Sequence, residues 1–487
     1  MSLSEQQINQ IVIDTIRSMR KDSEQKESEK LTSDFMRLEL EPVIEEKSNW
    51  LCNTIDEAVA SAKAGQRILS EMTLDQRDKL IYSMRRAAMD NVRYLSELAY
   101  NETGYGSIEH KIQKNTLAIE KTPGIEDLSA TAITGDFGLT MVELAPYGVI
   151  GAITPSTNPT STIINNSISM IAAGNSVVYN SHPGANKCSV ETMRVLNEAI
   201  VAAGGPATLI CSVKQPTAES GQELMDHKDV ALLTVTGGEG IVKVAMRSGK
   251  KVIAAGPGNP PVIVDDTAIL NQAARDIVDG ASFENNILCV AEKEVFVYDN
   301  VADRLMSEME NNGAYKISDD DIDKIVRTVL IQKNGDYYSN KNYIGKPAGF
   351  ILRESGVSFS ADPRLIIAEV DEDHPFVKVE MLMPVLAIVR VKDNNIRTAV
   401  KMALKAEADC KHSAVIHSQD VSNLSLAARV LNTSIFVKNA PSYAGLGFGG
   451  EGFTTLSIAT PTGEGLTSAR SFTRQRRCVM YGNFRIV

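Results

Sequence analysis

The run SFENNILCV at 282–290 places a thiol, Cys289, downstream of two glycine-rich turns and an Asn-Pro turn. A thiolate is a strong nucleophile that forms covalent acyl intermediates. The six cysteines are scattered, with no C-x-x-C pair and no cysteine–histidine set at zinc-ligand spacing. This scatter favours free thiols in a reducing cytosol, and no metal site is expected. Cys289 is therefore the candidate covalent catalyst.

Two glycine-rich turns precede this thiol. The run TGGEG at 236–240 follows an apolar segment and opens a helical pattern. Glycine lets the backbone approach a phosphate, and a helix N-terminus favours negative charge. The second turn, GPGNP at 256–260, suits a rigid wall of a site, but Pro261 prevents a G-x-G-x-x-G fingerprint. Either turn is also compatible with a purely structural role.

The Asn-Pro turn, TPSTNP at 154–159, ends an apolar run. Ligands of parallel α/β folds bind at the carboxyl ends of the strands. The Asn158 amide can donate to an oxyanion, or its side chain can cap the following helix. The turn alone favours the cap.

Strands and helices must alternate to position these turns. Apolar runs and helical patterns succeed each other through two stretches of the chain, about 147–255 and 261–440. Continuous apolar strands between helices predict parallel sheets covered on both faces. The fold class is therefore α/β, with a doubly wound dinucleotide-binding architecture in the first stretch. The segments 132–143 and 463–487 look extended and are expected to pair as an arm that is exchanged between subunits.

Composition excludes several functions. The chain has 487 residues, enough for two or three domains, and 43% hydrophobic and 23% charged residues, which is normal for a globular protein. A net charge of -11 argues against a nucleic-acid partner. No apolar run is long enough to span a bilayer, and the N-terminus has no secretory signal pattern.

The first twenty residues form a separate pattern. Apolar residues recur at helical spacing and form one stripe, and a polar, charge-dense linker follows; the stripe consists of Ile8, Ile11, Val12, Ile16 and Met19. A helix this short is marginal alone in water, so its apolar stripe needs a partner surface. That partner is either the same protein or a groove on another one.

Together the turns resemble those of the aldehyde dehydrogenase superfamily. The run at 146–179 is similar to the family's strand, Asn-Pro turn, helix and next strand, TVTGGEG to its glycine turn, and 282–290 to its nucleophile loop. EMLMPVL at 380–386 resembles its Glu-x-Phe-Gly-Pro motif. The resemblance covers about 41–487, with all four motifs in the family's order. It implies an aldehyde dehydrogenase-like fold with an α/β catalytic domain and a β oligomerisation arm.

More narrowly, ITPSTNPTST, ENNILCVAEKEV and SARSFTRQRRCVM resemble the CoA-acylating propionaldehyde and acetaldehyde dehydrogenases of bacterial microcompartments. The resemblance implies a cytoplasmic enzyme inside a microcompartment, whose residues 1–20 bind a shell protein as an encapsulation peptide. The implied reaction oxidises a short-chain aldehyde, propionaldehyde first, with NAD⁺ and CoA to acyl-CoA and NADH. The alternatives are a hydrolytic aldehyde dehydrogenase that yields an acid, a phosphorylating type, and an inactive scaffold that only binds a shell.

Two departures from the family's hydrolytic pattern are informative. Hydrolytic members carry a water-activating Glu before the second glycine turn, and the matching residue here is Ala254. An alanine cannot activate water, so the resemblance favours CoA as acyl acceptor. The Lys that contacts the adenosine ribose in the family is matched by Asn180, so adenosine contacts must differ.

The resemblance also implies roles for single residues. Cys289 is the nucleophile, whose pKa should be lowered by backbone N–H groups and nicotinamide, and Asn158 with the Cys289 N–H holds the oxyanion. The residues expected to contact the cofactor are Thr154, Pro155, His182, Thr236, Gly237, Gly238, Gly256 and Glu380. His412 and His417 flank an expected strand and are expected in the core or on the surface rather than near the site.

The expected division of the chain follows. It comprises a targeting helix (1–20), a linker (21–40), an NAD-binding domain (41–131 and 146–255), an oligomerisation arm (132–145 and 463–487), a catalytic domain (256–440) and a return segment (441–462). A homo-oligomer, dimer or tetramer, is expected.

Overall fold

The computed structural model describes residues 50–486. The expected targeting helix and linker lie outside the described residues. From Trp50 to Ile486 the chain forms two parallel sheets, each with a hydrophobic cluster on either face, and an antiparallel arm. Two short antiparallel pairs complete it, β12 (Leu330–Lys333) with β13 (Asp336–Ser339) and β18 (Ile458–Ala459) with β19 (Gly465–Leu466).

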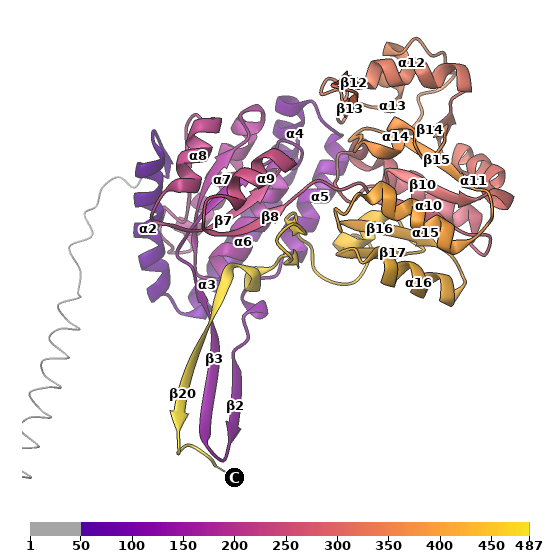
Figure 1. The fold of residues 1–487 in the computed structure, drawn as a ribbon. Coiled ribbons are helices and arrows are strands. Elements are labelled where there is room, and N and C mark those ends of the chain that lie inside the picture. The colour runs from indigo at the N-terminus through magenta and orange to yellow at the C-terminus, as the bar shows by residue number, and fades with distance from the viewer. Residues whose placement is uncertain (1–49, 487) are drawn as a thin grey trace, which may run out of the picture. The chain divides into compact units, whose positions relative to one another are not determined.

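The first sheet has six strands in the order β1-β6-β5-β4-β7-β8, and each neighbouring pair is parallel (Figure 1). The strands are β1 (Leu51–Cys52), β4 (Val149–Thr154), β5 (Ser176–Ser181), β6 (Ile210–Val213), β7 (Val230–Thr236) and β8 (Lys251–Ala255). The chain moves outward from β4 to β6 and then returns to β7 on the other side of β4. The strand order therefore reverses between β4 and β7, which is where such sheets bind ligands.

Helices cover both faces of this sheet. One face packs against α2 (Ile55–Glu71), α8 (Ala218–Asp226) and α9 (Glu239–Met246), and the other against α3 (Leu74–Asp90), α6 (Pro159–Ala172) and α7 (Asn186–Ala202). Successive strand residues point to opposite faces, so Val177 and Val178 lie in different cores. This confirms the predicted doubly wound arrangement. Two further helices, α4 (Val92–Thr103) and α5 (Ile108–Lys121), precede the sheet's central strand in the chain.

The second sheet has seven parallel strands in the order β11-β14-β15-β10-β9-β16-β17. They are β9 (Pro261–Val264), β10 (Glu294–Tyr298), β11 (Ala314–Lys316), β14 (Leu365–Glu369), β15 (Val385–Val391), β16 (Ser413–His417) and β17 (Ile435–Lys438). The sequence pattern gave no signal for β9, β11 and β14. β9 begins at a proline directly after the second glycine turn, and proline is tolerated at the first residue of a strand.

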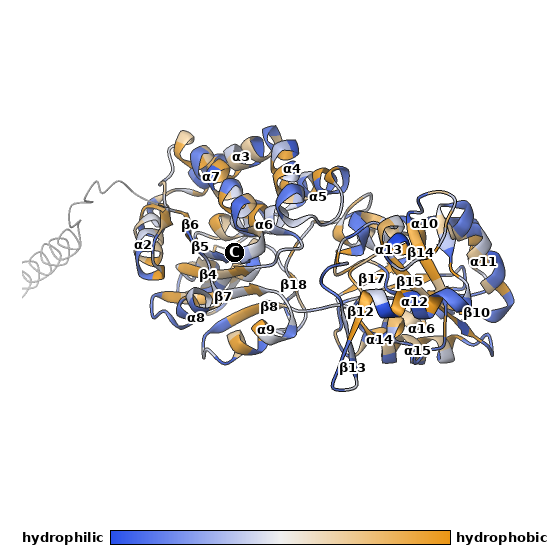
Figure 2. Ribbon diagram, turned by 90° about the horizontal axis from the view of Figure 1, so that it is seen from above, coloured by the Kyte–Doolittle hydropathy of each residue, from blue (hydrophilic) through white to orange (hydrophobic). Residues whose placement is uncertain are grey.

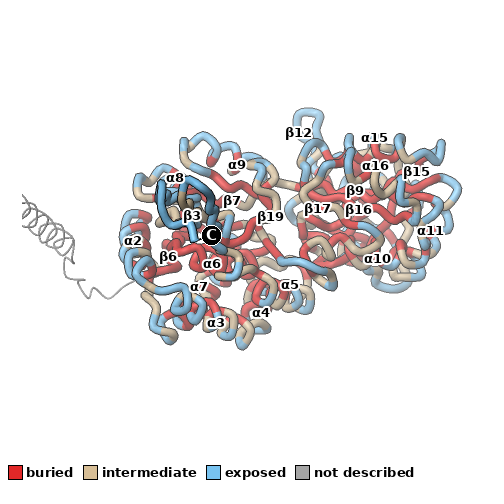
Figure 3. The backbone as a smooth tube through the Cα atoms, turned by 90° about the horizontal axis from the view of Figure 1, so that it is seen from below, coloured by how far each residue is buried: buried red, intermediate tan, exposed pale blue. Residues whose placement is uncertain are grey.

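Helices also enclose this second sheet. They are α10 (Leu270–Ser282), α11 (Asp299–Asn311), α12 (Asp319–Val329), α13 (Ala348–Glu354), α14 (Pro375–Lys378), α15 (Ile396–Glu407) and α16 (Val421–Leu431). Figure 2 shows that many helices are hydrophobic on one side and hydrophilic on the other, and Figure 3 shows that the strands they cover are buried. Within residues 50–486, no helix combines the length and apolar character needed to cross a membrane.

The two extended segments that the sequence singled out pair with each other. β2 (Thr131–Gly135), β3 (Gly138–Pro146) and β20 (Thr473–Tyr481) form a three-stranded antiparallel sheet, visible as an arm in Figure 1. β20 begins after the predicted boundary at 463. Before that strand, Ala469 and Phe472 are buried in the core of the first sheet, so the chain returns to this core before it enters the arm.

Asn175 ties the base of the arm to the first sheet. Its Oδ1 accepts the backbone N–H groups of Tyr147 (2.7 Å) and Gly148 (3.0 Å), and its Nδ2 donates to the carbonyl of Phe472 (2.9 Å). The side chain is fully buried. We expect Asn175→Ala to lower the free energy of unfolding by about 3 kcal/mol, because several buried polar groups lose their partners. Thermal unfolding measures this change. Asn271→Ala, at an exposed position, should shift stability by less than about 0.5 kcal/mol, and an equal shift in both variants would contradict the account.

Candidate active site

A cavity of about 690 Å³ lies at the carboxyl ends of β4, β5 and β7. All ten residues that the sequence assigned to catalysis or cofactor contact line it, namely Thr154, Pro155, Asn158, His182, Thr236, Gly237, Gly238, Gly256, Cys289 and Glu380. The first sheet supplies the strand ends and glycine turn, while Cys289 and Glu380 come from segments beside the second sheet. The cavity therefore brings together residues that are far apart in the sequence.

The part of the cavity beside α9 fits a dinucleotide. α9 begins after Gly238, which supplies no capping side chain, and a Cβ built there would meet no atom within 4 Å. Its first-turn N–H groups are therefore accessible to an anion. The hydroxyls of Thr154 and Ser181, at the ends of β4 and β5, are buried without a hydrogen-bond partner in the described chain. Such orphaned donors suit a polar ligand lying across the strand ends.

The adenosine side of the cavity carries no lysine at position 180. Asn180 donates to the carbonyl of Thr217 (3.1 Å) and accepts from the hydroxyl of Ser220 (2.6 Å), so its amide supports the start of α8. Nearby, His182 Nδ1 accepts the N–H of Gly184 (3.0 Å), and burial lowers the pKa of this imidazole. His182 is therefore neutral at neutral pH.

The nucleophile loop has an uncommon backbone. Glu284, Asn285 and Asn286 all have positive φ angles, of 51°, 53° and 65°. Positive φ angles are unfavourable for non-glycine residues, so neighbouring groups must stabilise this backbone conformation. The Asn285 amide donates to the carbonyls of Gly106 (3.1 Å) and Gly345 (2.8 Å), and the Asn286 amide donates to those of Ala281 and Glu292. The two asparagines thus fix the turn that presents Cys289.

The thiol of Cys289 is only partly exposed to the cavity. Burial raises its pKa to about 12, and the negative charge of Glu380 adds to this increase. Lys293, the Cys289 backbone N–H and Lys114 act in the opposite direction. Backbone N–H groups and nicotinamide are expected from the sequence to lower the pKa of Cys289. The protein groups by themselves raise it, because the effect of desolvation is larger than that of the two cations.

Lys293 is buried and holds the loop on its other side. Its Nζ donates to the carbonyls of Asn286 (2.9 Å) and Leu288 (3.3 Å) and also to the Asn286 side chain. This lysine therefore combines a structural role in the nucleophile loop with a favourable charge for a thiolate.

Glu380 belongs to the segment between α14 and β15. Its Oε1 accepts the N–H of Gly258 in the second glycine turn (3.5 Å), and burial raises the pKa of the carboxyl group. The carboxylate and the glycine turn therefore meet at one wall of the cavity.

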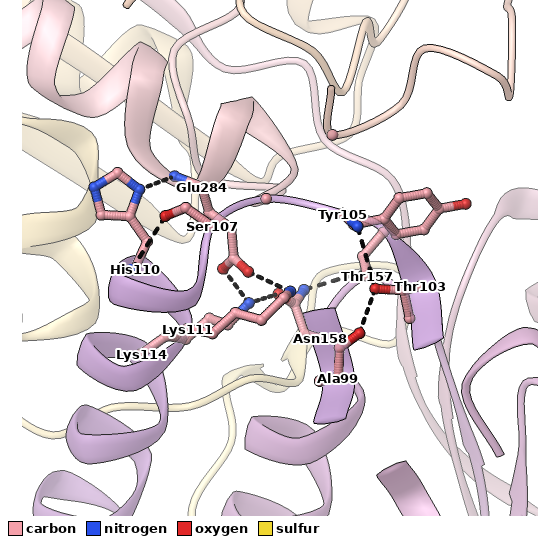
Figure 4. A network of polar contacts seen from close by, with 12 residues as sticks. Ala99, Thr103, Tyr105, Ser107, His110, Lys111, Lys114, Thr157, Asn158 and Glu284 are labelled. Carbon is pink, nitrogen blue, oxygen red and sulfur yellow. Dashed lines mark hydrogen bonds and ion pairs between the residues drawn. The ribbon is translucent and has the colours of Figure 1, made fainter. Parts of the chain in front are cut away.

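Asn158 occupies the residue before α6 but does not cap it, because its side chain makes no capping hydrogen bond. Its Oδ1 instead accepts from Lys114 Nζ of α5 (2.7 Å), and its Nδ2 donates to Thr157 Oγ1 (3.3 Å), as Figure 4 shows. The cap that the turn alone favoured is therefore wrong. The amide nitrogen is directed away from Lys114.

Comparison with known proteins shows the family and the fold of this chain. The sequence profile of the aldehyde dehydrogenase family matches residues 43–457. This chain belongs to the aldehyde dehydrogenase family. An acetylating acetaldehyde dehydrogenase from Bilophila wadsworthia is 48% identical over 90% of this chain and 91% of its own length.

Two solved structures resemble this aldehyde dehydrogenase closely. A propionaldehyde dehydrogenase from the fucose utilisation microcompartment of Clostridium phytofermentans is 45% identical, with a TM-score of 0.88 over 90% of this chain and 100% of its own. A Rhodopseudomonas palustris propionaldehyde dehydrogenase with bound CoA and an acylated cysteine is 46% identical, with a TM-score of 0.86 over 89% and 98% of the two chains. These likenesses confirm the predicted fold class.

The cavity of the enzyme offers few groups that could activate water. Ala254 belongs to β8, and its side chain lies in the core rather than in the cavity wall. Among the described residues that line the cavity, Glu380 is the single carboxylate. Position 254 therefore supplies no base that could activate water.

Several residues near the site escaped the sequence analysis. Glu284 of the nucleophile loop is buried between Lys111 and Lys114 of α5, and the segment 455–458 lines the cavity. Lysines at helical spacing normally indicate a solvated face, and their partner Glu284 lies 170 residues from Lys114, so no local pattern reveals them. His412 and His417 are both buried. His412 nevertheless lies near the site, because a Cβ built on Gly258 would meet both its ring (2.9 Å) and the Cys289 carbonyl oxygen (2.8 Å).

Because the charge of Glu380 raises the pKa of Cys289, Glu380→Gln should increase thiolate formation. We expect alkylation of Cys289 by iodoacetamide at pH 8 to become roughly threefold faster or more in this variant. Mass spectrometry of the Cys289 peptide follows the reaction. Glu354→Gln, an exposed carboxylate on α13, is the control and should leave the rate unchanged. A slower reaction in Glu380→Gln would contradict the electrostatic account.

Proposed function

We propose that Cys289 carries the acyl group in a reaction that oxidises a short-chain aldehyde, propionaldehyde first, and transfers the product to CoA. The enzyme is a CoA-acylating aldehyde dehydrogenase. The observation that carries this proposal is the shortage of water-activating groups in a cavity that holds a nucleophilic thiol. The bound CoA and acylated cysteine of the Rhodopseudomonas palustris relative support it.

In the first step the Cys289 thiolate attacks the aldehyde carbon and forms a carbon–sulfur bond. The aldehyde oxygen becomes an oxyanion, which accepts hydrogen bonds from the Asn158 amide and the Cys289 N–H. The orientation of the amide by Lys114 supports this role. One such donor contributes about 3 kcal/mol to the stability of the transition state.

In the second step the tetrahedral carbon loses a hydride, and a thioester forms on Cys289. NAD⁺ supplies the hydride acceptor when it is bound. The first turn of α9 would bind its phosphates, and Glu380 would position its nicotinamide ribose, as the fit of the cavity suggests.

In the third step the CoA thiolate attacks the thioester, and Cys289 leaves as a thiolate. One thioester replaces another, so the exchange is close to thermoneutral and needs no strong base. CoA enters the same cavity after the reduced dinucleotide has left. Kinetics should therefore be ping-pong, and the reverse reaction from acyl-CoA to aldehyde should be accessible.

Omitting CoA should stop the enzyme after one turnover, because the acyl group then stays on Cys289. A stopped-flow trace of NADH absorbance should show a burst of about one NADH per active site and almost no steady phase. Cys289→Ala should show no burst. Steady NADH production without CoA would show that water accepts the acyl group and would support the hydrolytic alternative.

The N-terminal segment is proposed to attach the enzyme to a microcompartment shell. The apolar stripe within residues 1–20 supports this, as does the microcompartment origin of the Clostridium phytofermentans relative. The proposed location is therefore the lumen of a cytoplasmic microcompartment, with a shell protein as partner.

Ile11→Glu should abolish co-sedimentation of the full-length enzyme with purified shells, because it places a charge in the apolar stripe. Gln10→Glu adds the same charge on the polar side and should retain co-sedimentation. Both variants should keep wild-type turnover. Equal co-sedimentation of the two variants, or loss of turnover in Ile11→Glu, would contradict a dedicated docking stripe.

The arm is proposed to join subunits in a homo-oligomer. Its strands expose a group of apolar side chains, and Phe137 stacks against Tyr481 with ring centroids 6.5 Å apart. The exposed set comprises Ile133, Phe137, Val479, Met480 and Tyr481. A monomeric arm with so much apolar surface is unfavourable in water, and a second copy of the chain would cover it.

A further inference from the structure

We propose that Lys114 is a positioning residue for the oxyanion step: it fixes the Asn158 amide with its N–H groups toward the cavity and links that amide to the nucleophile loop. The residues involved are Lys111 and Lys114 of α5, Asn158 before α6, and Glu284 of the nucleophile loop (Figure 4). This inference rests on the proposed role of Asn158 as an oxyanion donor.

The contact between Lys114 and Asn158 determines how the amide is turned. An ammonium group only donates hydrogen bonds, so the atom facing Lys114 Nζ at 2.7 Å must be the amide oxygen. The amide nitrogen then lies on the other side, where one N–H donates to Thr157 Oγ1. The second N–H has no partner among residues 50–486, and both Thr157 and Asn158 line the cavity. Without Lys114, the amide could rotate and turn its oxygen toward the oxyanion, and the two oxygens would repel each other.

Glu284 makes the burial of Lys114 possible. Lys111, Lys114 and Glu284 are all less than 5% exposed, and the carboxylate bonds to both ammonium groups. A buried cation without a partner is very costly, whereas this carboxylate neutralises one of the two positive charges. The cluster keeps one positive charge in a region where water does not screen it. That charge polarises the Asn158 amide and strengthens its N–H groups as donors.

The same carboxylate belongs to the nucleophile loop. The Glu284 N–H donates to His110 Nδ1 (2.8 Å), and the His110 ring stacks on Phe283 with centroids 4.4 Å apart. A Cβ on Gly106 would lie 2.3 Å from Glu284 Cγ, so the loop packs closely against the segment preceding α5. Lys114 therefore contacts both the oxyanion donor and the loop that carries Cys289. It can hold the two at a fixed separation, as an oxyanion site requires.

A double-mutant cycle tests the proposal. We expect Lys114→Met to slow the NADH burst with propionaldehyde at least tenfold, and Asn158→Ala to slow it about a hundredfold or more. In the Asn158→Ala background, Lys114→Met should add less than about twofold, because the group through which it acts is gone. The dissociation constant of NAD⁺ should stay within about twofold of wild type in Lys114→Met.

Lys111→Met is the matched control. It removes the same charge from the same carboxylate at an equally buried position of the same helix, but the Lys111 ammonium bonds to Glu284 and not to Asn158 in the described structure. We expect it to slow the burst less than about threefold. An effect equal to that of Lys114→Met would mean that the cluster acts only through the stability of the loop.

The pH dependence gives a readout that does not depend on how well a variant folds. Burial lowers the pKa of Lys114 to about 8, against the effect of Glu284 and Cys289 and together with that of Lys111. Lys114 is charged below this pH and neutral above it. The ratio of wild-type to Lys114→Met burst rates should therefore be largest below pH 8 and fall above it. Lys114 also lowers the pKa of Cys289, so the rate of Cys289 alkylation by iodoacetamide is measured in both proteins over the same pH range, and the ratio of burst rates is divided by the ratio of alkylation rates.

The outcomes separate this inference from the proposed function. An unchanged burst in Asn158→Ala would remove the oxyanion role itself. Two other results would overturn only the positioning role. One is a slow burst in Asn158→Ala that Lys114→Met slows further by the same factor as in the wild-type background. The other is a ratio of wild-type to Lys114→Met burst rates that stays constant or rises with pH. If Lys114→Met fails to fold, Lys114→Gln, which keeps a donor but no charge, takes its place. It should slow the burst less than tenfold and lack the change in ratio near pH 8.

Discussion

The carboxylate of Glu284 is fully buried, and its two ion pairs with Lys111 and Lys114 determine where the nucleophile loop can lie. A buried carboxylate that lost these partners would cost several kcal/mol. These ion pairs hold the loop against helix α5. Together with the hydrogen bonds of the Asn285 and Asn286 amides, they stabilise the left-handed backbone of the loop. The position of Cys289 follows from this arrangement.

Segments from both parallel sheets form the walls of the cavity. The first sheet contributes the carboxyl ends of β4, β5 and β7, where the strand order reverses and a dinucleotide can lie across the crevice. The segments around the second sheet contribute the thiol and Glu380. Neither sheet supplies both the proposed dinucleotide site and the thiol, so the contacts of α5 help to place the two relative to each other.

Sequence patterns predicted the cavity well because its residues lie at strand ends and in turns with strong local signals. Asn158 and the TGGEG turn lie at the ends of apolar runs that form β4 and β7, Cys289 lies in the turn between α10 and β10, and all line one cavity. The lysines of α5 gave no such signal, since their charge is compensated by a residue far along the chain. β9 was hidden by its short length and its initial proline, and the cap assigned to Asn158 was wrong because Lys114 binds its oxygen.

We propose that the acyl group stays on Cys289 as a thioester until CoA, rather than water, accepts it. Intact-protein mass spectrometry after mixing enzyme with propionaldehyde and NAD⁺ in the absence of CoA tests this most directly. The account predicts one propionyl group per chain, located on the Cys289 peptide, that persists in buffer and disappears with stoichiometric formation of propionyl-CoA when CoA is added. An adduct that is lost to water as fast as to CoA, or one located on another residue, would contradict it.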